Sequence, residues 1–186
     1  MSAGPILRTE RLILRPWRPD DLEPFAALNA DHRVTATLAG SIDRAASDAL
    51  AGRWNASFAS HGFGYWAVEL ASTSSFIGAL GLAVPGFPAH FMPAVEIGWR
   101  LAFDHWGKGY ATEGAQAALD FGFNQIGLAE IVSFTAKSNA KSRAVMERLG
   151  MHSDPKDDFN HIRLGPDHPL HAHVLYRLRR EDWQPR

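Results

Sequence analysis

Two glycines separated by one residue, Gly107 and Gly109, mark the stretch whose residue types could do chemistry. They belong to the segment Trp106-Gly-Lys-Gly-Tyr-Ala-Thr-Glu113, between an expected strand and an expected amphipathic helix. Glycines at this spacing let the backbone turn tightly and approach a ligand closely. The helix that we expect from about Ala111 presents unpaired N–H groups and a partial positive charge, which together bind phosphate. The segment therefore predicts a site for a phosphate-bearing ligand.

Two familiar phosphate loops do not fit this segment. A P-loop requires Lys and then Ser or Thr after its last glycine, whereas Tyr110 follows Gly109. A dinucleotide fingerprint requires a third glycine, and Thr112 stands in its place. A glycine-rich turn without any ligand is the alternative for a single G-x-G. The strand–loop–helix context favours a loop that holds a pyrophosphate on consecutive backbone amides.

The composition excludes several other kinds of chemistry. The 186 residues include no Cys, which removes disulfides, Cys-ligated zinc, iron–sulfur clusters and a cysteine nucleophile. A formal net charge of −1 lacks the basic excess of a dedicated nucleic-acid binder. No apolar run approaches the roughly 20 residues of a membrane span, and the N-terminus lacks a secretory pattern. We expect a cytoplasmic protein without nucleic-acid or membrane partners.

Hydrophobic periodicity predicts the elements that position the glycine loop. We expect one domain over residues 1–186, because this length suffices for one core and no repeat or linker divides it. Strands are expected at 9–17, 62–71, 76–84, 94–101, 130–136 and 173–180, and helices from about 20, at 43–60, 111–126 and 139–149. This order predicts an α/β (α+β) fold with a mixed sheet and helices on its faces.

The strand expected over 94–101 has two distinct faces, because side chains alternate along a strand. One face carries Val95, Ile97, Trp99 and Leu101, and the other carries Ala94, Glu96, Gly98 and Arg100. The second face is polar and belongs to the strand that leads into the glycine loop.

The glycine segment resembles the acetyl-CoA-binding signature Gln/Arg-x-x-Gly-x-Gly/Ala of the GNAT superfamily of N-acetyltransferases. Trp106 stands where Gln or Arg is usual, and in this the segment looks like the ribosomal-protein N-terminal acetyltransferase (RimJ/RimL-like) branch. Three further segments are similar to that branch, namely Thr9-Glu-Arg-Leu-Ile-Leu-Arg15, Asn139-Ala-Lys-Ser142 and Met146-Glu-Arg-Leu-Gly150. The likeness covers nearly the whole chain. It implies the GNAT fold, a mixed central sheet of about seven strands flanked by about four helices.

The resemblance implies an acyltransferase that moves the acetyl group of acetyl-CoA to a primary amine by direct attack in a ternary complex. The lack of Cys agrees, because no acyl-cysteine can form. Amines attack as the free base, and deprotonation at pH 7 costs about 4–5 kcal/mol for a lysine but about 1–1.5 kcal/mol for an α-amine. By branch analogy we expect a protein or peptide α-amine as acceptor.

Other functions stay open at this point. A small-molecule amine (a polyamine, an aminoglycoside or an amino acid) is the alternative acceptor. A non-catalytic acyl-CoA-binding regulatory module and a ligand-free structural domain are alternatives of another class. The expected assembly is a monomer or a homodimer.

The resemblance also assigns roles to individual residues. Glu96 is the candidate general base, and its alternative is an ion pair with Arg100. Ser142 is the candidate acid or thiolate-stabilising donor. Asn139 is implied to bind the pantetheine amides, or it simply caps its helix. The backbone of Leu101 and Phe103 is implied to pair with the pantetheine arm. The remaining cofactor-binding candidates are Trp106, Gly107, Lys108, Gly109, Tyr110, Ala111 and Thr112, although Lys108 could equally be a solvated loop lysine.

Two further features carry weaker expectations. His171 and His173 could lie on one face of a strand, but without an obvious third ligand we expect no metal. The apolar segment 85–93 is expected to be exposed as a wall of the acceptor pocket or a dimer contact, or else to be folded onto the sheet.

Overall fold

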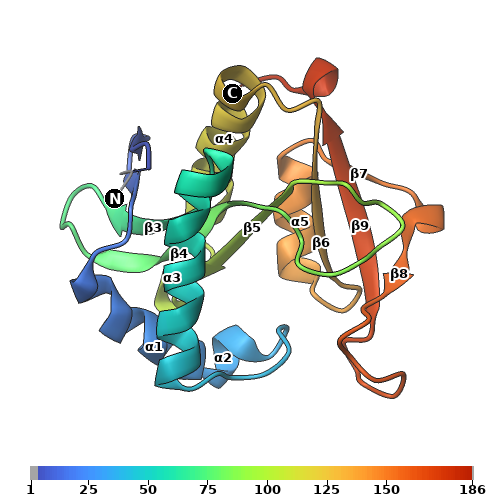
Figure 1. The fold of residues 1–186 in the computed structure, drawn as a ribbon, viewed down its shortest axis with the longest axis horizontal. Helices are drawn as coiled ribbons and strands as arrows, with labels where there is room; N and C mark the ends of the chain where they lie inside the picture. The colour runs from blue at the N-terminus through green and yellow to red at the C-terminus, as the bar shows by residue number, and fades with distance from the viewer. Residues whose placement is uncertain (1–3, 186) are drawn as a thin grey trace.

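The computed structural model describes residues 4–185, and the strands of this part form one mixed sheet (Figure 1). The strands follow the order β1-β2-β3-β4-β5-β6-β9-β7, with β8 also paired to β9. Every pairing is antiparallel except that of β5 with β6. The bounds are β1 Leu7–Arg8, β2 Leu12–Arg15, β3 Tyr65–Leu70, β4 Phe76–Ala83, β5 Glu96–Leu101, β6 Glu130–Ala136, β7 His152–Ser153, β8 Phe159–Asn160 and β9 Ala172–Arg179.

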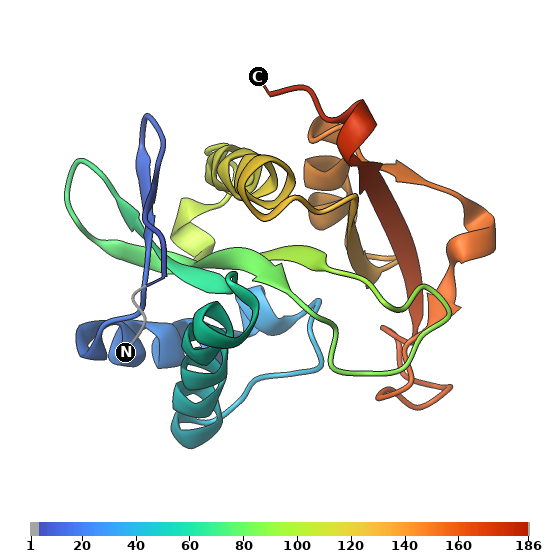
Figure 2. The same ribbon diagram turned by 45° about the horizontal axis from the view of Figure 1, so that its top comes forward.

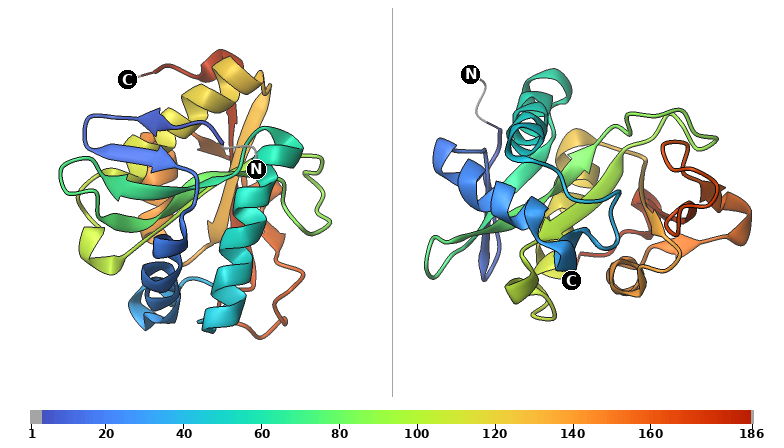
Figure 3. Two further views of the ribbon diagram at one scale, coloured as in Figure 1. Left: turned by 60° about the vertical axis from the view of Figure 1, so that its left-hand side comes forward. Right: turned by 90° about the horizontal axis from the view of Figure 1, so that it is seen from below.

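Helices cover both faces of the sheet (Figures 2 and 3). Their bounds are α1 Leu22–Ala30, α2 His32–Thr35, α3 Arg44–His61, α4 Tyr110–Asp120 and α5 Ala140–Arg148. The helices α1 and α3 pack on one face, and α4 and α5 pack on the other. None of the described helices is long and apolar enough to cross a membrane.

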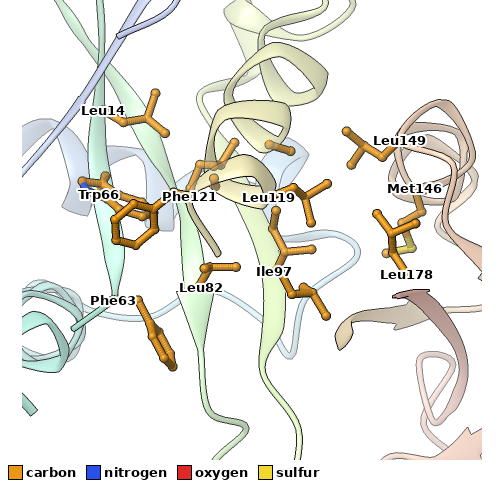
Figure 4. Packing of buried hydrophobic residues seen from close by; sticks show 14 of the residues in the cluster. Leu14, Phe63, Trp66, Leu82, Ile97, Leu119, Phe121, Met146, Leu149 and Leu178 are labelled. Atoms are coloured by element: carbon orange, nitrogen blue, oxygen red, sulfur yellow. The ribbon is translucent and has the colours of Figure 1, made fainter. Parts of the chain in front are cut away.

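Side-chain alternation along β5 separates two hydrophobic clusters. Ile97 and Leu101 join the larger cluster under α4 and α5 (Figure 4), which includes the fully buried Leu119. The opposite face of the sheet packs Phe25 of α1 and Ala51 of α3 in a second cluster. The two faces predicted for this strand are therefore confirmed, and they carry different neighbours.

The sheet opens between β5 and β6. Only one residue pair, Glu96 with Val132, joins the two strands. Near it, the N–H of Val132 donates to the Val95 carbonyl at 2.9 Å, and Ser133 Oγ donates to the Ile97 carbonyl at 2.8 Å. Beyond this point β6 continues along β9 alone, so β5 and β6 diverge. The antiparallel pattern with β4 directs the backbone groups of alternate β5 residues into the gap.

Most of the predicted elements are confirmed, and the differences concern short pieces. Of the expected strand 9–17 only β2, Leu12–Arg15, is extended, and the unexpected β1 at Leu7–Arg8 precedes it across a turn in which Thr9 Oγ1 accepts from the Leu12 N–H at 3.0 Å. The four-residue α2 and the two-residue β7 and β8 were not expected. The described residues thus form nine strands and five α-helices, against about seven and about four. The helix expected over 111–126 is α4 followed by a π-helical segment at Phe121–Ile126.

The apolar segment 85–93 folds onto the end of the sheet. Phe91 is only 6% exposed and lies in a cluster with Val132 and Leu175. Phe87 contacts Phe134 edge-on, with ring centroids 5.5 Å apart. The expectation of an exposed segment is wrong for Phe91, and the alternative of a loop folded onto the sheet describes its position.

Candidate functional site

A cavity of about 1530 Å³ lies along the end of β5 and reaches the first turns of α4 and α5. Ten of the twelve predicted site residues line it, namely Leu101, Phe103, Trp106, Gly107, Gly109, Tyr110, Ala111, Thr112, Asn139 and Ser142. Lys108 and Glu96 are not among the lining residues. Residues predicted from distant parts of the chain therefore meet around one space.

The glycine loop presents backbone donors to this cavity. Gly107 and Gly109 have φ angles of 73° and 82°, a conformation that favours glycine. Gly109 is the N-cap of α4, and its carbonyl accepts from the Glu113 N–H at 3.0 Å. The first N–H groups of α4 precede this bond and have no intrahelical acceptor. The loop and the helix start can therefore hold an anionic group such as a pyrophosphate.

Arg11 braces this loop, a role that was not predicted. Its Nε donates to Glu113 Oε2 at 2.7 Å and its Nη1 to the Lys108 carbonyl at 3.0 Å. Thr9 Oγ1 donates to the other oxygen of Glu113 at 2.5 Å. Burial opposes ionisation of Glu113, but these hydrogen bonds outweigh it and lower the pKa of the carboxyl. The segment from Thr9 to Arg15 was predicted to be a strand, but nothing in it indicated a contact with Glu113, about a hundred residues away.

Lys108 contributes its backbone rather than its side chain. Its side chain is exposed and absent from the cavity lining, while its carbonyl accepts from Arg11. This position agrees with the alternative of a solvated loop lysine.

Trp106 closes the end of β5. Its indole Nε1 donates to the Leu101 carbonyl at 2.8 Å, and the Trp106 N–H donates to the Phe103 carbonyl at 3.0 Å. The Lys141 ammonium lies 4.6 Å from the centroid of the Trp106 ring. Because both carbonyls already accept a hydrogen bond, the N–H groups of Leu101 and Phe103 are the more open backbone groups toward an added ligand strand.

Asn139 and Ser142 form one polar unit at the start of α5. Asn139 Oδ1 accepts from the Ser142 N–H at 3.2 Å, which is the expected helix cap. Asn139 Nδ2 donates to Thr135 Oγ1 at 2.9 Å and to Ser142 Oγ at 3.0 Å. The Ser142 hydroxyl thus accepts from Asn139, and among the described residues its own hydrogen has no acceptor. It is free to donate into the cavity.

Glu96 lies beside the ring of Tyr65, on the face of β5 that is directed toward α1 and α3 and that also carries Arg100. The Tyr65 hydroxyl occupies the space left by the missing side chain of Gly98, between the positions of Glu96 and Arg100. Burial raises the pKa of Glu96 from its ordinary value near 4.5 to about 7. Within the described chain Glu96 forms no ion pair with Arg100, so the alternative reading of this carboxylate does not describe the structure.

Tyr65 is a site neighbour that the sequence did not predict, and Arg100 was considered only as an ion-pair partner of Glu96. The Tyr65 ring stacks on Trp54, with centroids 4.4 Å apart and planes at 11°. Burial, with a contribution from Glu96, raises the pKa of the Tyr65 hydroxyl well above 10. The only signal in the sequence was Gly98 between two charged residues on one strand face. It did not reveal which side chain would occupy the space above Gly98.

The C-terminal histidines belong to the aromatic cluster at segment 85–93. The rings of His161 and His173 lie 4.9 Å apart, and His173 packs on Phe159. Burial lowers the pKa of both imidazoles. Within residues 4–185 no group of three side chains is arranged to hold a metal ion.

Fold and cavity together define a class: α+β proteins with a split sheet, a glycine loop at a helix start and a polar strand face beside it. Residues 11–152 match the acetyltransferase (GNAT) domain family. The chain belongs to this family and is an N-acetyltransferase with the GNAT fold, for which the family implies acetyl-CoA as donor.

Two curated relatives and two solved structures show how far the likeness extends. FsC-acetyl coenzyme A-N(2)-transacetylase of Aspergillus fumigatus is 33% identical, over 98% of this chain and 80% of its own length. YkkB of Bacillus subtilis is 32% identical over 82% and 88%. An acetyltransferase structure from Agrobacterium tumefaciens aligns with a TM-score of 0.77 at 33% identity, covering 94% of both chains. Ribosomal-protein-S5-alanine acetyltransferase of Vibrio fischeri aligns at 0.74 and 19% identity over 98% and 100%, which shows the fold alone.

Proposed function

We propose that this enzyme acetylates an α-amine, with the N-terminus of a protein or peptide as the leading acceptor. The observation that carries the proposal is the position of the partly buried Glu96 on the same face of β5 as Arg100, which lines the cavity. Burial raises the pKa of Glu96 to about 7, which suits proton transfer from an α-amine with its ordinary value near 8. The pKa of a lysine ammonium is near 10.4, so the difference between the pKa of the base and that of the acceptor would be much larger for a lysine. The likeness of the glycine segment to the RimJ/RimL-like branch supports a peptide acceptor.

Each proposed step uses a group described above. Glu96, directly or through one water, takes the proton of the acceptor ammonium. The free amine then attacks the thioester carbon, an N–C bond forms and the C–S bond breaks. The Ser142 hydroxyl donates a hydrogen bond to the departing thiolate, while Asn139 holds that hydroxyl in place. Glu96 releases the first proton to solvent and then takes the second amine proton, and the products are an acetamide and the CoA thiolate, which is protonated from solvent.

Acetyl-CoA fits the cavity on this assignment. The N–H groups at Gly107, Gly109 and the start of α4 receive the pyrophosphate, and the gap beyond the last β5–β6 contact receives the pantetheine arm. Arg11 and Glu113 keep the loop in register with β2.

A small-molecule acceptor is the second candidate. It is favoured by the similarity over 98% of this chain to a relative that is named for N(2)-acetyl transfer to FsC. That name describes the relative alone.

The test measures CoA release with acceptors that differ only in the amine offered. The peptide Ala-Ala-Ala-amide offers an α-amine, Nα-acetyl-lysine amide offers a side-chain amine, and spermidine and an aminoglycoside represent small molecules. We expect kcat/KM to be at least tenfold higher for the peptide α-amine. A higher value for the lysine derivative, or for spermidine, contradicts the proposal.

A further inference from the structure

Arg100 is a cation at the cavity that the proposed chemistry does not use. It extends from the polar face of β5, lines the cavity and is partly buried. Its Nη1 donates to Asn29 Oδ1 of α1 at 2.6 Å. The fully buried Asn29 is itself held by Ser47 of α3, because its Nδ2 donates to Ser47 Oγ at 2.8 Å. The guanidinium is therefore anchored on one side by a rigid neutral amide.

Within the part of the chain that the structure describes, no carboxylate pairs with this guanidinium. Glu96 stands four residues away on the same face, and the Tyr65 hydroxyl lies over Gly98 between them. Trp54 contributes only the face of its ring, 5.9 Å from the guanidinium carbon. Burial lowers the pKa of Arg100. Charged groups removed from water are as a rule paired, so this arrangement is complete only when an anion arrives.

A comparison with the buried Arg15 shows which partner Arg100 lacks. Arg15 is 4% exposed, and it is satisfied by two carboxylates, Asp21 at 2.7 Å and Glu69 at 2.5 Å. The side-chain partner of Arg100 is the neutral amide oxygen of Asn29, whereas the partners of Arg15 are carboxylates. The fold thus neutralises the arginine that has a structural position and leaves the charge of the arginine at the cavity unpaired.

We propose that Arg100 binds a carboxylate of the acceptor, so that the acceptors of this enzyme are amines that also carry a carboxylate. This rests on the proposed function, because it places the acceptor amine at Glu96. Glu96 and Arg100 are four residues apart on one strand face, which separates them by about 13 Å along the strand. An acceptor can therefore engage both groups when roughly 7 Å separates its amine from its carboxylate, because a hydrogen bond of about 3 Å at each end spans the rest. A polyamine offers the wrong charge to Arg100.

The test compares matched acceptors with and without the negative charge. Ala-Asp-amide and Ala-Asn-amide form the peptide pair, and 5-aminopentanoate and 5-aminopentanamide form the small-molecule pair. In the wild-type enzyme we expect kcat/KM for the carboxylate to exceed that for the amide at least tenfold in one pair, which also identifies the source of the carboxylate. Arg100→Met should bring this ratio to within twofold of one. The control Arg53→Met, on the exposed side of α3, should keep the wild-type ratio.

Two outcomes overturn the inference: equal rates for both members of both pairs in the wild type, or a preference that survives in Arg100→Met. If Arg100→Met does not fold, Asn29→Asp replaces it. The new carboxylate would pair with Arg100 inside the protein, so the preference should disappear although the arginine is present. A preference that persists in Asn29→Asp contradicts the inference as well.

A binding measurement separates this inference from the proposed function. Titration of the CoA-saturated enzyme with Ala-Asp-amide and with 5-aminopentanoate detects acceptor binding without turnover. If no acceptor is acetylated but one of these probes binds at least tenfold more tightly to the wild type than to Arg100→Met, the proposed function fails and the carboxylate site stands. If neither probe shows binding that depends on Arg100, the carboxylate site fails whatever the enzyme acetylates.

Discussion

The hydroxyl of Tyr65 occupies the place that a Cβ would need on Gly98. The phenol of β3 therefore reaches across the face of β5, and the ring stays flat against Trp54 of α3. The contact places a ring between the only acid and the only base on this strand face, Glu96 and Arg100. The absence of a side chain at Gly98 thus allows the Tyr65 hydroxyl to lie between Glu96 and Arg100.

Gly98→Ala should destabilise the fold, because the new methyl group must displace the Tyr65 hydroxyl. We expect the free energy of unfolding to fall by about 1–3 kcal/mol, as for other overpacked sites. Urea denaturation measures it. In a Tyr65→Phe background the same substitution should cost less, since the displaced oxygen is gone.

The control is Gly52→Ala in α3, where a Cβ meets nothing within 4 Å. Replacing an exposed helical glycine should raise stability by about 0.5–1 kcal/mol. Equal effects at Gly98 and Gly52, or no relief in the Tyr65→Phe background, would show that the packing described here is wrong.

Gly109→Val should abolish acetyl-CoA binding, because a β-branched residue at φ 82° strains the loop and its Cβ approaches Arg11. Gly127 also has φ 82°, with open space around it, but it lies outside the cavity lining. Gly127→Val carries the same backbone strain and should keep wild-type affinity. Isothermal titration distinguishes the two, and unchanged affinity in Gly109→Val would remove the pyrophosphate assignment.

The rate should depend on the ionisation of Glu96. As the proposed base it must be charged, so kcat/KM should rise with pH and level off above about 7. Glu96→Gln should lower kcat by about 10²–10⁴-fold and remove this rise. A pH profile that keeps its inflection near 7 in Glu96→Gln would assign the proton transfer to another group.

The free energy of unfolding should depend on the same pKa of Glu96, but it should fall with rising pH where kcat/KM rises. The native state holds a proton on Glu96 up to about pH 7, whereas the unfolded chain releases it near pH 4.5. The native state thus binds more protons in this window, so the Glu96 contribution to stability is present below about 4.5 and is lost as the pH rises to 7. Between these limits Glu96→Gln should gain up to about 3 kcal/mol relative to the wild type. Parallel stability curves for the two proteins would contradict burial of this carboxyl.

Ser142→Ala tests the donor to the leaving group. We expect kcat to fall about tenfold, equivalent to about 1.4 kcal/mol in the barrier. The helix cap should survive, because Asn139 Oδ1 accepts from the backbone N–H of Ser142 and not from its hydroxyl. Ser138→Ala, an exposed change just before the cap, is the control. An unchanged kcat in Ser142→Ala would leave thiolate departure to solvent.

Elements with local signals were predictable from the sequence. The helix α3 has Asp43 at its start, accepting from the Ala46 N–H at 2.8 Å, and Gly62 in the left-handed conformation at its end. The strand β6 matches the expected range 130–136, and side chains on both of its faces are buried. By contrast, the turn between β1 and β2 depends on Glu113, which bonds both Thr9 and the Arg11 backbone. Such a contact between remote segments leaves no periodic signal.

The site also has a part that was predictable from the sequence and a part that was not. The glycine loop and Asn139 are read from neighbours in sequence, and the structure places them around one cavity. The approach of Tyr65 to Gly98 and the link from Arg100 to Asn29 join separate elements across the sheet. They follow only from strand register, which pairs Tyr65 with Gly81 and Gly81 with Gly98.

The alternation of side chains along β5 has a consequence for how such enzymes diverge. Residues 96, 98 and 100 face the layer of α1 and α3, whereas residues 97 and 101 belong to the core that supports α4 and the glycine loop. If the proposed roles of Glu96 and Arg100 are right, substitutions at the even positions change the preferred acceptor without loosening the packing under the glycine loop. Drift in acceptor preference and retention of the donor can proceed on the same six-residue strand, because they act on opposite faces of it.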